Sequence, residues 1–154
     1  MKKIILPFII IVTISYACTN TDKKPGKEDG PANMADSLIK VIDDGHHEGM
    51  GKIGRLHNTR NAVQHVIDSI GKLPAKAQEA AASFIEQLKS AVKDLNDANG
   101  LMESWMTEYD QDSARDDEAK RIEYLEGEKS KIERMKEAIR NSLAKADSLL
   151  KAKF

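Results

Sequence analysis

The sequence contains few cysteine, proline and aromatic residues. Its one cysteine among 154 residues, Cys18, excludes an internal disulfide. Prolines number four, and aromatic residues make up 5% of the chain. Because strands favour aromatic and β-branched residues, this composition favours helices over sheets. The scarcity of these residues predicts an all-α fold.

The chain also lacks an excess of charge of either sign. It has 24 Lys and Arg residues against 25 Asp and Glu residues, for a formal net charge of −1. Hydrophobic residues at 40% and charged residues at 32% are typical of a soluble, amphipathic helical protein. We expect no nucleic-acid partner, because nothing in this balance attracts a phosphate backbone.

Most catalytic motifs are absent as well. The chain has no Gly-x-Ser-x-Gly, no phosphate-binding loop and no Cys-x-x-Cys pair. The segment from His47 to Gly51 begins like the zinc-protease motif, but glycine stands where that motif requires its second histidine. We therefore expect a protein without catalytic activity.

The first 18 residues have the three parts of a bacterial signal peptide. Two lysines precede an apolar run over residues 4–14, and a short segment then leads to Cys18. The run is too short to span a bilayer, so residues 1–17 are predicted to be removed. A small residue, Ala17, directly before a cysteine is similar to the lipobox, whose cysteine receives a diacylglycerol and a further acyl chain such as palmitate. Several acyl chains hold a protein firmly on a membrane. We predict that Cys18 is lipidated; the alternative is an ordinary secretory signal cut near Ala17.

Residues 18–34 are predicted to form a disordered tether after the lipidated cysteine. They contain two prolines, two glycines and no apolar run. No acidic run follows Cys18, so we see no sign of export to the cell surface. The expected location is the Gram-negative envelope, anchored to a membrane and facing the periplasm.

Apolar residues recur at steps of three and four through residues 35–154, which places them on one face of a helix. The clearest stripe consists of Ala81, Phe84, Leu88, Ala91, Leu95, Ala98, Met102, Trp105 and Tyr109. Matching stripes predict helices over about 34–70, 75–109 and 114–152, the last capped by Ser113. Short connections make consecutive helices antiparallel. We therefore predict an antiparallel three-helix bundle of long, coiled-coil-like helices.

Four glycines interrupt the first expected helix, at Gly45, Gly49, Gly51 and Gly54. Each costs roughly 1 kcal/mol relative to alanine in a helix. Either the helix is kinked or broken there, or the glycines let another helix approach closely. We expect a continuous but weak helix, weakest at Gly49–Gly51.

One group of residues offers soft metal ligands near the tether end of the expected bundle. The candidates are two pairs at helical spacing, His46 with Met50 and Met102 with Met106. Imidazole and thioether ligands suit Cu(I), and His46 with His47 would suit Zn(II) or Cu(II) at the surface. Expected pocket or core neighbours are His47, Trp105, Tyr124 and Glu128.

Plain hydrophobic core is the favoured interpretation of this group. Methionine at helical spacing usually fills irregular gaps beside an aromatic ring. A core histidine usually has a carboxylate or backbone partner. A pocket for a small ligand or a partner is the remaining alternative, and His57 and His65 are expected at the surface.

Three motifs lie downstream of the cysteine: H-x-E-x-M-x-K from His46, M-x-x-W-M from Met102 and YLE from Tyr124. With the signal peptide, they resemble a family of small helical lipoproteins of Gram-negative bacteria, commonly labelled "viral A-type inclusion protein". The resemblance covers essentially the whole mature domain and departs from the family pattern at His47, Gly49 and Gly51. It implies an envelope location and a helical shape, and it supplies no reaction.

These observations favour a structural or protein-binding role at the membrane. Slender bundles with heptad-like stripes add a fourth helix from a partner, or associate with a second copy. The alternative is a periplasmic protein that binds copper or zinc through His46, Met50, Met102 and Met106. No other cofactor is expected beyond the covalent lipid on Cys18.

Overall fold

A computed structural model describes residues 31–152 of the chain. Within this range the protein is all-helical, with 87% of residues in helices and no strand. The expectation of an all-α fold is therefore confirmed. The predicted signal peptide, Cys18 and residues 19–30 of the predicted tether lie outside the described residues. The tether prediction is wrong for residues 31–34, which belong to the first helix. Among the helices within residues 31–152, none has the length and apolar character needed to cross a membrane.

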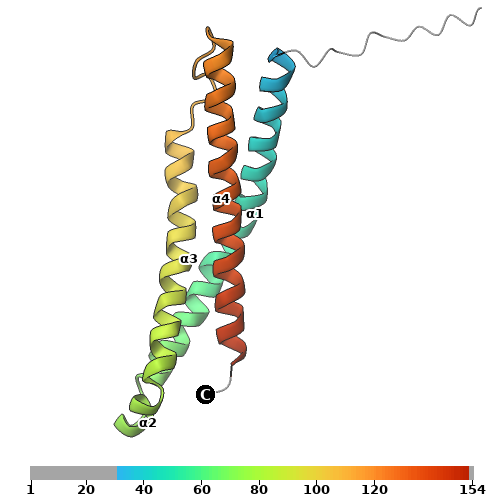
Figure 1. Ribbon diagram of the computed structural model, residues 1–154. Helices are drawn as coiled ribbons and strands as arrows, with labels where there is room; N and C mark the ends of the chain where they lie inside the picture. Colours follow the sequence, from blue (N-terminus) through green and yellow to red (C-terminus); the bar gives the residue numbers. More distant parts are fainter. Residues whose placement is uncertain (1–30, 153–154) are drawn as a thin grey trace, which may run out of the picture.

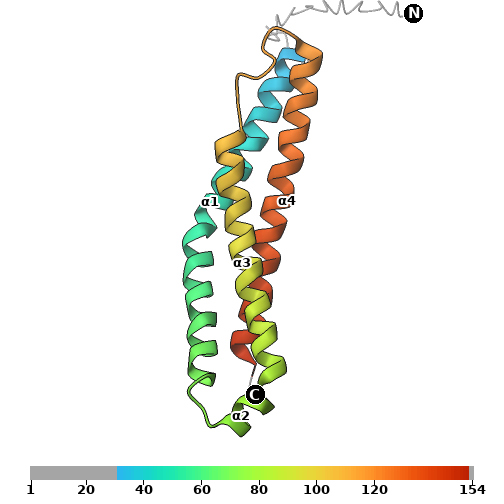
Figure 2. The same cartoon turned by 90° about the vertical axis from the view of Figure 1, so that its left-hand side faces the viewer.

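Four helices pack together: α1 (Pro31–Ile70), α2 (Ala75–Ala80), α3 (Ala82–Glu108) and α4 (Glu118–Lys151). The three long helices α1, α3 and α4 each contact the other two, whereas α2 contacts α3. The start of α1 and the connection from α3 to α4 lie at one end of the elongated molecule, and α2 lies at the other (Figures 1 and 2). We call the first of these the α1-start end.

The expectation of one unbroken helix over 75–109 is wrong at Ala81. This residue separates α2 from α3, although backbone hydrogen bonds from Ala81 to Ala77 and from Ile85 to Ala81 continue across it. Ala81 is 3% exposed, whereas α2 buries no residue. We infer that α2 departs from the line of α3 because the core holds Ala81, whereas α2 buries no residue and is tied to the preceding turn by hydrogen bonds from Gln78 Nε2 to the Gly71 and Leu73 carbonyl oxygens.

The last helix starts later than expected, at Glu118 instead of 114. Its N-cap is Asp117, whose side chain accepts a hydrogen bond from the Lys120 N–H at 3.2 Å, so the prediction of a Ser113 cap is wrong. Ala114 has a φ of 56°, a left-handed conformation that costs an L-residue roughly 1–2 kcal/mol and ends helical continuity. The connection is therefore a nine-residue segment, 109–117, outside regular helix.

The core consists of the apolar stripes of the three long helices. The largest fully buried side chains are Ile42, Leu56, Val63, Ile70, Leu88, Leu95, Met102, Leu125, Ile132 and Ile139. The predicted stripe of α3 is buried from Leu88 to Trp105, and that of α4 from Leu125 to Ala146.

Helix α1 runs through all four of its central glycines without a break, as expected. Gly45 and Gly49 face neighbouring helices: an added Cβ would overlap Cγ2 of Ile132 on α4 or Cε of Met102 on α3. An added Cβ at Gly51 or Gly54 would have no atom of a neighbouring element within 4 Å. Close helix approach therefore explains two of the glycines, and the axis of α1 changes direction near its middle in both views (Figures 1 and 2).

Candidate functional site

Trp105 on α3 forms the centre of an aromatic cluster near the α1-start end. Its ring centroid lies 5.2 Å from that of His46 on α1 and 4.7 Å from that of Tyr109. Tyr109 in turn lies 6.5 Å from Tyr124 on α4, with nearly parallel rings. Aromatic pairs of this kind contribute roughly 0.5–1.5 kcal/mol beyond their buried area. The cluster therefore joins all three long helices.

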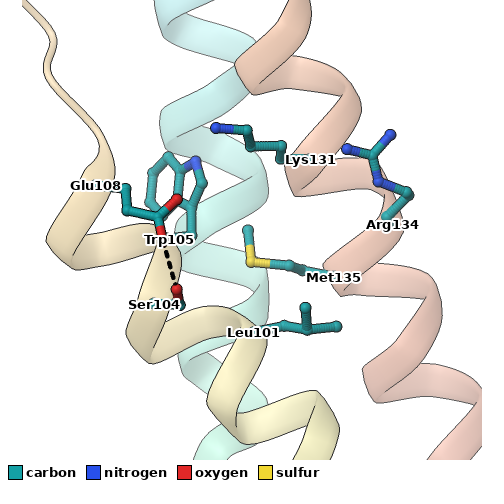
Figure 3. A pocket seen from close by; sticks show the side chains of 7 residues that line it. All are labelled: Leu101, Ser104, Trp105, Glu108, Lys131, Arg134 and Met135. Carbon is teal, nitrogen blue, oxygen red and sulfur yellow. Dashed lines mark hydrogen bonds between the residues drawn. The ribbon is translucent and has the colours of Figure 1, made fainter.

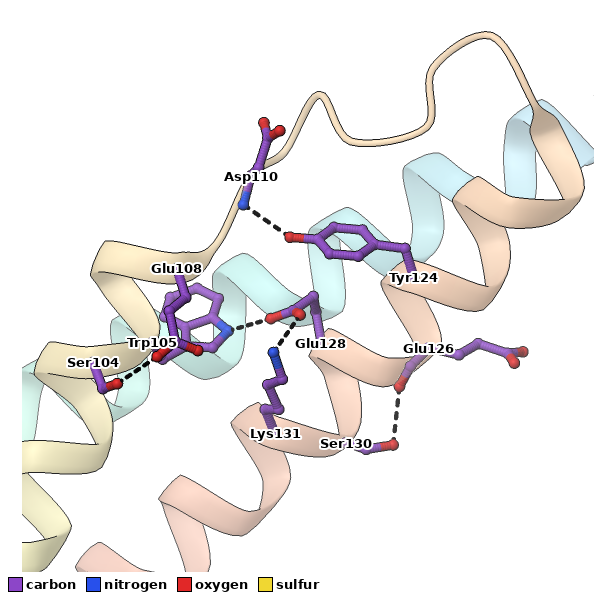
Figure 4. A network of polar contacts seen from close by, with 9 residues as sticks. All are labelled: Ser104, Trp105, Glu108, Asp110, Tyr124, Glu126, Glu128, Ser130 and Lys131. Atoms are coloured by element: carbon purple, nitrogen blue, oxygen red, sulfur yellow. Dashed lines mark hydrogen bonds and ion pairs between the residues drawn. The ribbon is translucent and has the colours of Figure 1, made fainter.

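A buried carboxylate on α4 supports this cluster. Glu128 is 3% exposed and accepts hydrogen bonds from Trp105 Nε1 and from Lys131 Nζ, both at 2.8 Å (Figure 4). The hydrogen bond to Glu128 raises the pKa of Lys131. Both carboxylate oxygens thus have partners, which a buried charge requires.

Two tyrosines link the connecting segment to this cluster. The Tyr124 hydroxyl accepts a hydrogen bond from the Asp110 N–H at 2.8 Å (Figure 4). The Tyr109 hydroxyl is buried and has no hydrogen-bond partner within residues 31–152. Burial, followed by electrostatic interactions with Asp43, Tyr124 and Glu128, raises the pKa of Tyr109 to about 12.

The predicted metal ligands divide between core and surface. Met102 is 1% exposed and lies against Gly49, which agrees with a core role. Met50 and Met106 are 40% and 44% exposed, so the core interpretation is wrong for both. The α1 stripe continues through Gly49 instead of Met50.

The histidines are also placed differently from one another. His46 has a buried Nε2 with no hydrogen-bond partner among the described residues, so the expected core partner is missing. His47 is exposed, with Nδ1 at 2.8 Å from the Asp43 carbonyl oxygen. His57 and His65 are exposed as expected, and His57 lies at hydrogen-bond distance from Asn99. Within residues 31–152, no three His, Cys, Asp or Glu side chains gather as a metal site would require.

Two hollows lie along the line where α3 and α4 meet, which we call the α3–α4 seam. The upper hollow, of about 130 Å³, is nearer the α1-start end and has Leu101, Trp105 and Met135 among its lining residues (Figure 3). The lower hollow, of about 280 Å³, has Leu101, Ala98 and Ala138 among its lining residues. Leu101 is shared by both and is 47% exposed.

Sequence reasoning missed the seam because it followed only the buried stripe. Leu101 precedes Met102 and lies off that stripe, so it was not assigned a role. The sequence feature that could have indicated the seam is Leu101 itself, a large apolar residue next to the core positions of an otherwise regular amphipathic helix.

Comparison with protein-family models, with curated proteins and with solved structures finds no match to this chain.

Proposed function

We propose that this protein is a membrane-anchored envelope lipoprotein of the family that it resembles, and that its helical domain binds a partner protein without catalysing a reaction. We further propose that this domain is an antiparallel three-helix bundle of α1, α3 and α4, to which α2 is appended. The α3–α4 seam carries this proposal: Leu101 is 47% exposed between two hollows with apolar lining residues. An apolar side chain of another protein that enters these hollows would remove the exposed surface of Leu101 from water, which favours association.

The anchor would orient the domain. Only residues 19–30 separate Cys18 from the first residue of α1. The α1-start end would therefore lie nearer the membrane, and α2 would lie farther away by about the length of α1, roughly 60 Å for 40 residues. The seam would then face the periplasm between these two ends.

The test expresses the full sequence in a Gram-negative host, with and without Cys18→Ser. Metabolic labelling with a palmitate analogue and mass spectrometry of the mature N-terminus report lipidation. A photo-crosslinking residue at position 101 reports a partner, and the same residue at His65, also exposed, is the matched control. We expect lipid on Cys18 and a crosslinked protein at 101 only. An unmodified Cys18 would reject the anchor, and the absence of any crosslink would reject the binding role.

The second candidate function is binding of Cu(I) or Zn(II), favoured by the buried, unpartnered Nε2 of His46 within residues 31–152. Metal at several hundred times its dissociation constant should stabilise the protein by about 3–4 kcal/mol. Thermal unfolding with Cu(I) under reducing conditions, and separately with Zn(II), measures this. His46→Ala and Met102→Leu should abolish the shift. No shift with either ion would reject this candidate.

A further inference from the structure

We propose that the α3–α4 seam binds an amphipathic helix of a partner protein, whose apolar stripe has acidic residues along one flank and basic residues along the other. This inference rests on the proposed partner-binding function and names the chemistry of the partner. It depends on three features of the seam: the spacing of its hollows, the apolar residues in them and the charges of its two walls.

The two hollows have the spacing of side chains on a docked helix. Met135 lines the upper hollow and Ser142 the lower, seven residues further along α4. Seven residues of helix correspond to about 10 Å. An aligned partner helix would place residues i and i+7 at the same separation, the usual anchor spacing of a helix in a groove. The hollows, at about 130 and 280 Å³, are smaller than the roughly 300–1,000 Å³ of small-molecule pockets.

The lining of each hollow includes apolar side chains. In the upper hollow, Trp105 and Met135 are buried side chains, and Leu101 stands beside them with 47% of its surface exposed (Figure 3). In the lower hollow, Ala98 and Ala138 leave room because their side chains are small. A partner's apolar anchors would remove this surface from water, which is the favourable term in docking.

The α4 wall of the seam is cationic. Lys131 and Arg134 line the upper hollow from α4 (Figure 3). Lys145 lines the lower hollow from the same helix. Lys131 is bonded to Glu128, whereas Arg134 makes no ion pair or side-chain hydrogen bond with any residue in 31–152. Arg134 is therefore free to pair with a carboxylate of an occupant.

The α3 wall is anionic. Glu108 lines the upper hollow, and its only side-chain hydrogen bond within the described residues is accepted from Ser104 Oγ at 2.7 Å. Asp94 and Asp97 line the lower hollow; Asp94 pairs across the seam with Lys145 at 2.6 Å, and Asp97 pairs with Lys93. The unpaired charges of the seam thus lie at the upper hollow, a cation on α4 and an anion on α3. This division fits a helix with acid on one flank and base on the other.

The test uses three synthetic three-heptad peptides with leucines at the a and d positions and no aromatic residue. One has glutamate along one flank and lysine along the other, one has glutamate on both flanks, and one has lysine on both. The protein is expressed from its full sequence and purified in mild detergent. Trp105 is the only tryptophan of the chain and lines the upper hollow, so its emission reports occupancy. We expect the mixed peptide to bind about fivefold tighter than either uniform peptide at low salt, the effect of a few exposed ion pairs.

Matched variants assign the binding to the seam. Leu101→Gln should weaken the mixed peptide about tenfold, as loss of an apolar anchor contact does. Met106→Gln, which changes an equally exposed apolar residue of α3 outside both hollows, should leave binding unchanged. Arg134→Glu places an anion on both walls of the upper hollow and should therefore make the lysine peptide bind tighter than the mixed and the glutamate peptides. Circular dichroism of each variant verifies that the helices remain.

Three outcomes would overturn the proposal: equal binding of all peptides, no response to Leu101→Gln, or no binding of any peptide. A chain that dimerises through Leu101 and binds no peptide would show that the occupant is a second copy. A partner crosslinked in cells at position 101 whose capture is insensitive to charge reversal at Arg134 would keep the proposed function and reject the charged-flank inference.

Discussion

At the scale of single residues, Glu128 explains the most about the aromatic end of the domain. A carboxylate at a core position is expensive unless its oxygens are paired. Here one oxygen accepts a hydrogen bond from the Trp105 indole N–H, and the other accepts one from Lys131 Nζ. The Lys131 side chain is itself 43% exposed. The carboxylate therefore sets the orientation of the indole ring and holds one wall of the upper hollow.

Substitution of Glu128 should separate hydrogen bonding from charge. Glu128→Leu leaves the indole N–H buried without an acceptor and should lower the free energy of unfolding by about 1–3 kcal/mol. Glu128→Gln retains an oxygen acceptor for Trp105 and should cost less. Urea denaturation followed by circular dichroism measures both. A leucine variant as stable as the parent would show that this bond contributes nothing to stability.

Tyr109 should titrate at unusually high pH. Burial raises its pKa to about 12 in the folded protein, against about 10 in an unfolded chain. Between these values the unfolded state has lost the proton that the folded state retains, so the free energy of unfolding should fall as pH rises from about 10 to 12. Below pH 10 both states are protonated, and the effect vanishes.

The absorbance of tyrosinate measures this ionisation directly. Tyr109→Phe should remove a step in tyrosinate absorbance near pH 12. The free energy of unfolding of this variant should also fall less steeply with rising pH than that of the parent, since lysine ionisation affects both proteins alike. A step that persists in the variant would assign it to another tyrosine and contradict the burial argument.

At the scale of elements, α1 combines poor helix-forming residues with close packing. Four glycines weaken it as an isolated helix, yet the structure keeps it continuous over 40 residues. The reason is tertiary. Gly45 and Gly49 permit contact with Ile132 and Met102, whereas Gly51 offers no such contact.

Alanine substitutions should therefore act in opposite directions along α1. Gly51→Ala should raise the free energy of unfolding by about 0.5–1 kcal/mol, because nothing lies near the new Cβ and alanine favours the helix. Gly49→Ala should lower it by about 1–3 kcal/mol through crowding of Met102. Gly45→Ala should lower the free energy of unfolding further. The new Cβ would meet Cγ2 of Ile132, which is attached to a branched Cβ and moves aside less easily than Cε at the end of the flexible Met102 side chain. Thermal and urea unfolding rank the three; similar stabilisation by all of them would contradict the close approach of the helices.

At the scale of the whole molecule, the position of the first residue of α1 determines which end would face a membrane. The first residue of α1 and the segment 109–117 share the α1-start end, and α2 lies at the opposite end (Figure 1). An anchor at Cys18 would therefore bring the 109–117 segment towards lipid and leave the turn at 71–74 remote from it.

Energy transfer in lipid vesicles tests this orientation. A dye on Asp112→Cys should transfer energy to labelled lipid headgroups more efficiently than the same dye on Lys76→Cys, because about 60 Å of helix separates the two ends. Cys18 is the one cysteine of the sequence, so its proposed lipidation would leave the introduced cysteine as the single site for the label. Equal transfer from the two positions would contradict an upright domain.

Much of the fold could be predicted because helical periodicity is local. The stripes from Leu88 to Trp105 and from Leu125 to Ala146 follow from spacing alone, and both are buried. The interruption at Ala81 and the left-handed Ala114 could not be predicted, since alanine is a strong helix former and carries no turn preference. The candidate site was foreseen only in part: Trp105, Tyr124 and Glu128 do gather, but Leu101, Lys131 and Arg134 were not identified.

The order of neighbouring residues is enough to predict that most of residues 31–152 are helical and which face of each long helix is apolar, because both follow from local spacing. Three further features are visible only in the folded molecule: Gly49 and not Met50 faces the core, Glu128 accepts a hydrogen bond from Trp105, and Leu101 lies between two hollows. Those outcomes depend on the rotation and height of one helix against another. Side chains distant in the chain set both, and no local pattern records them.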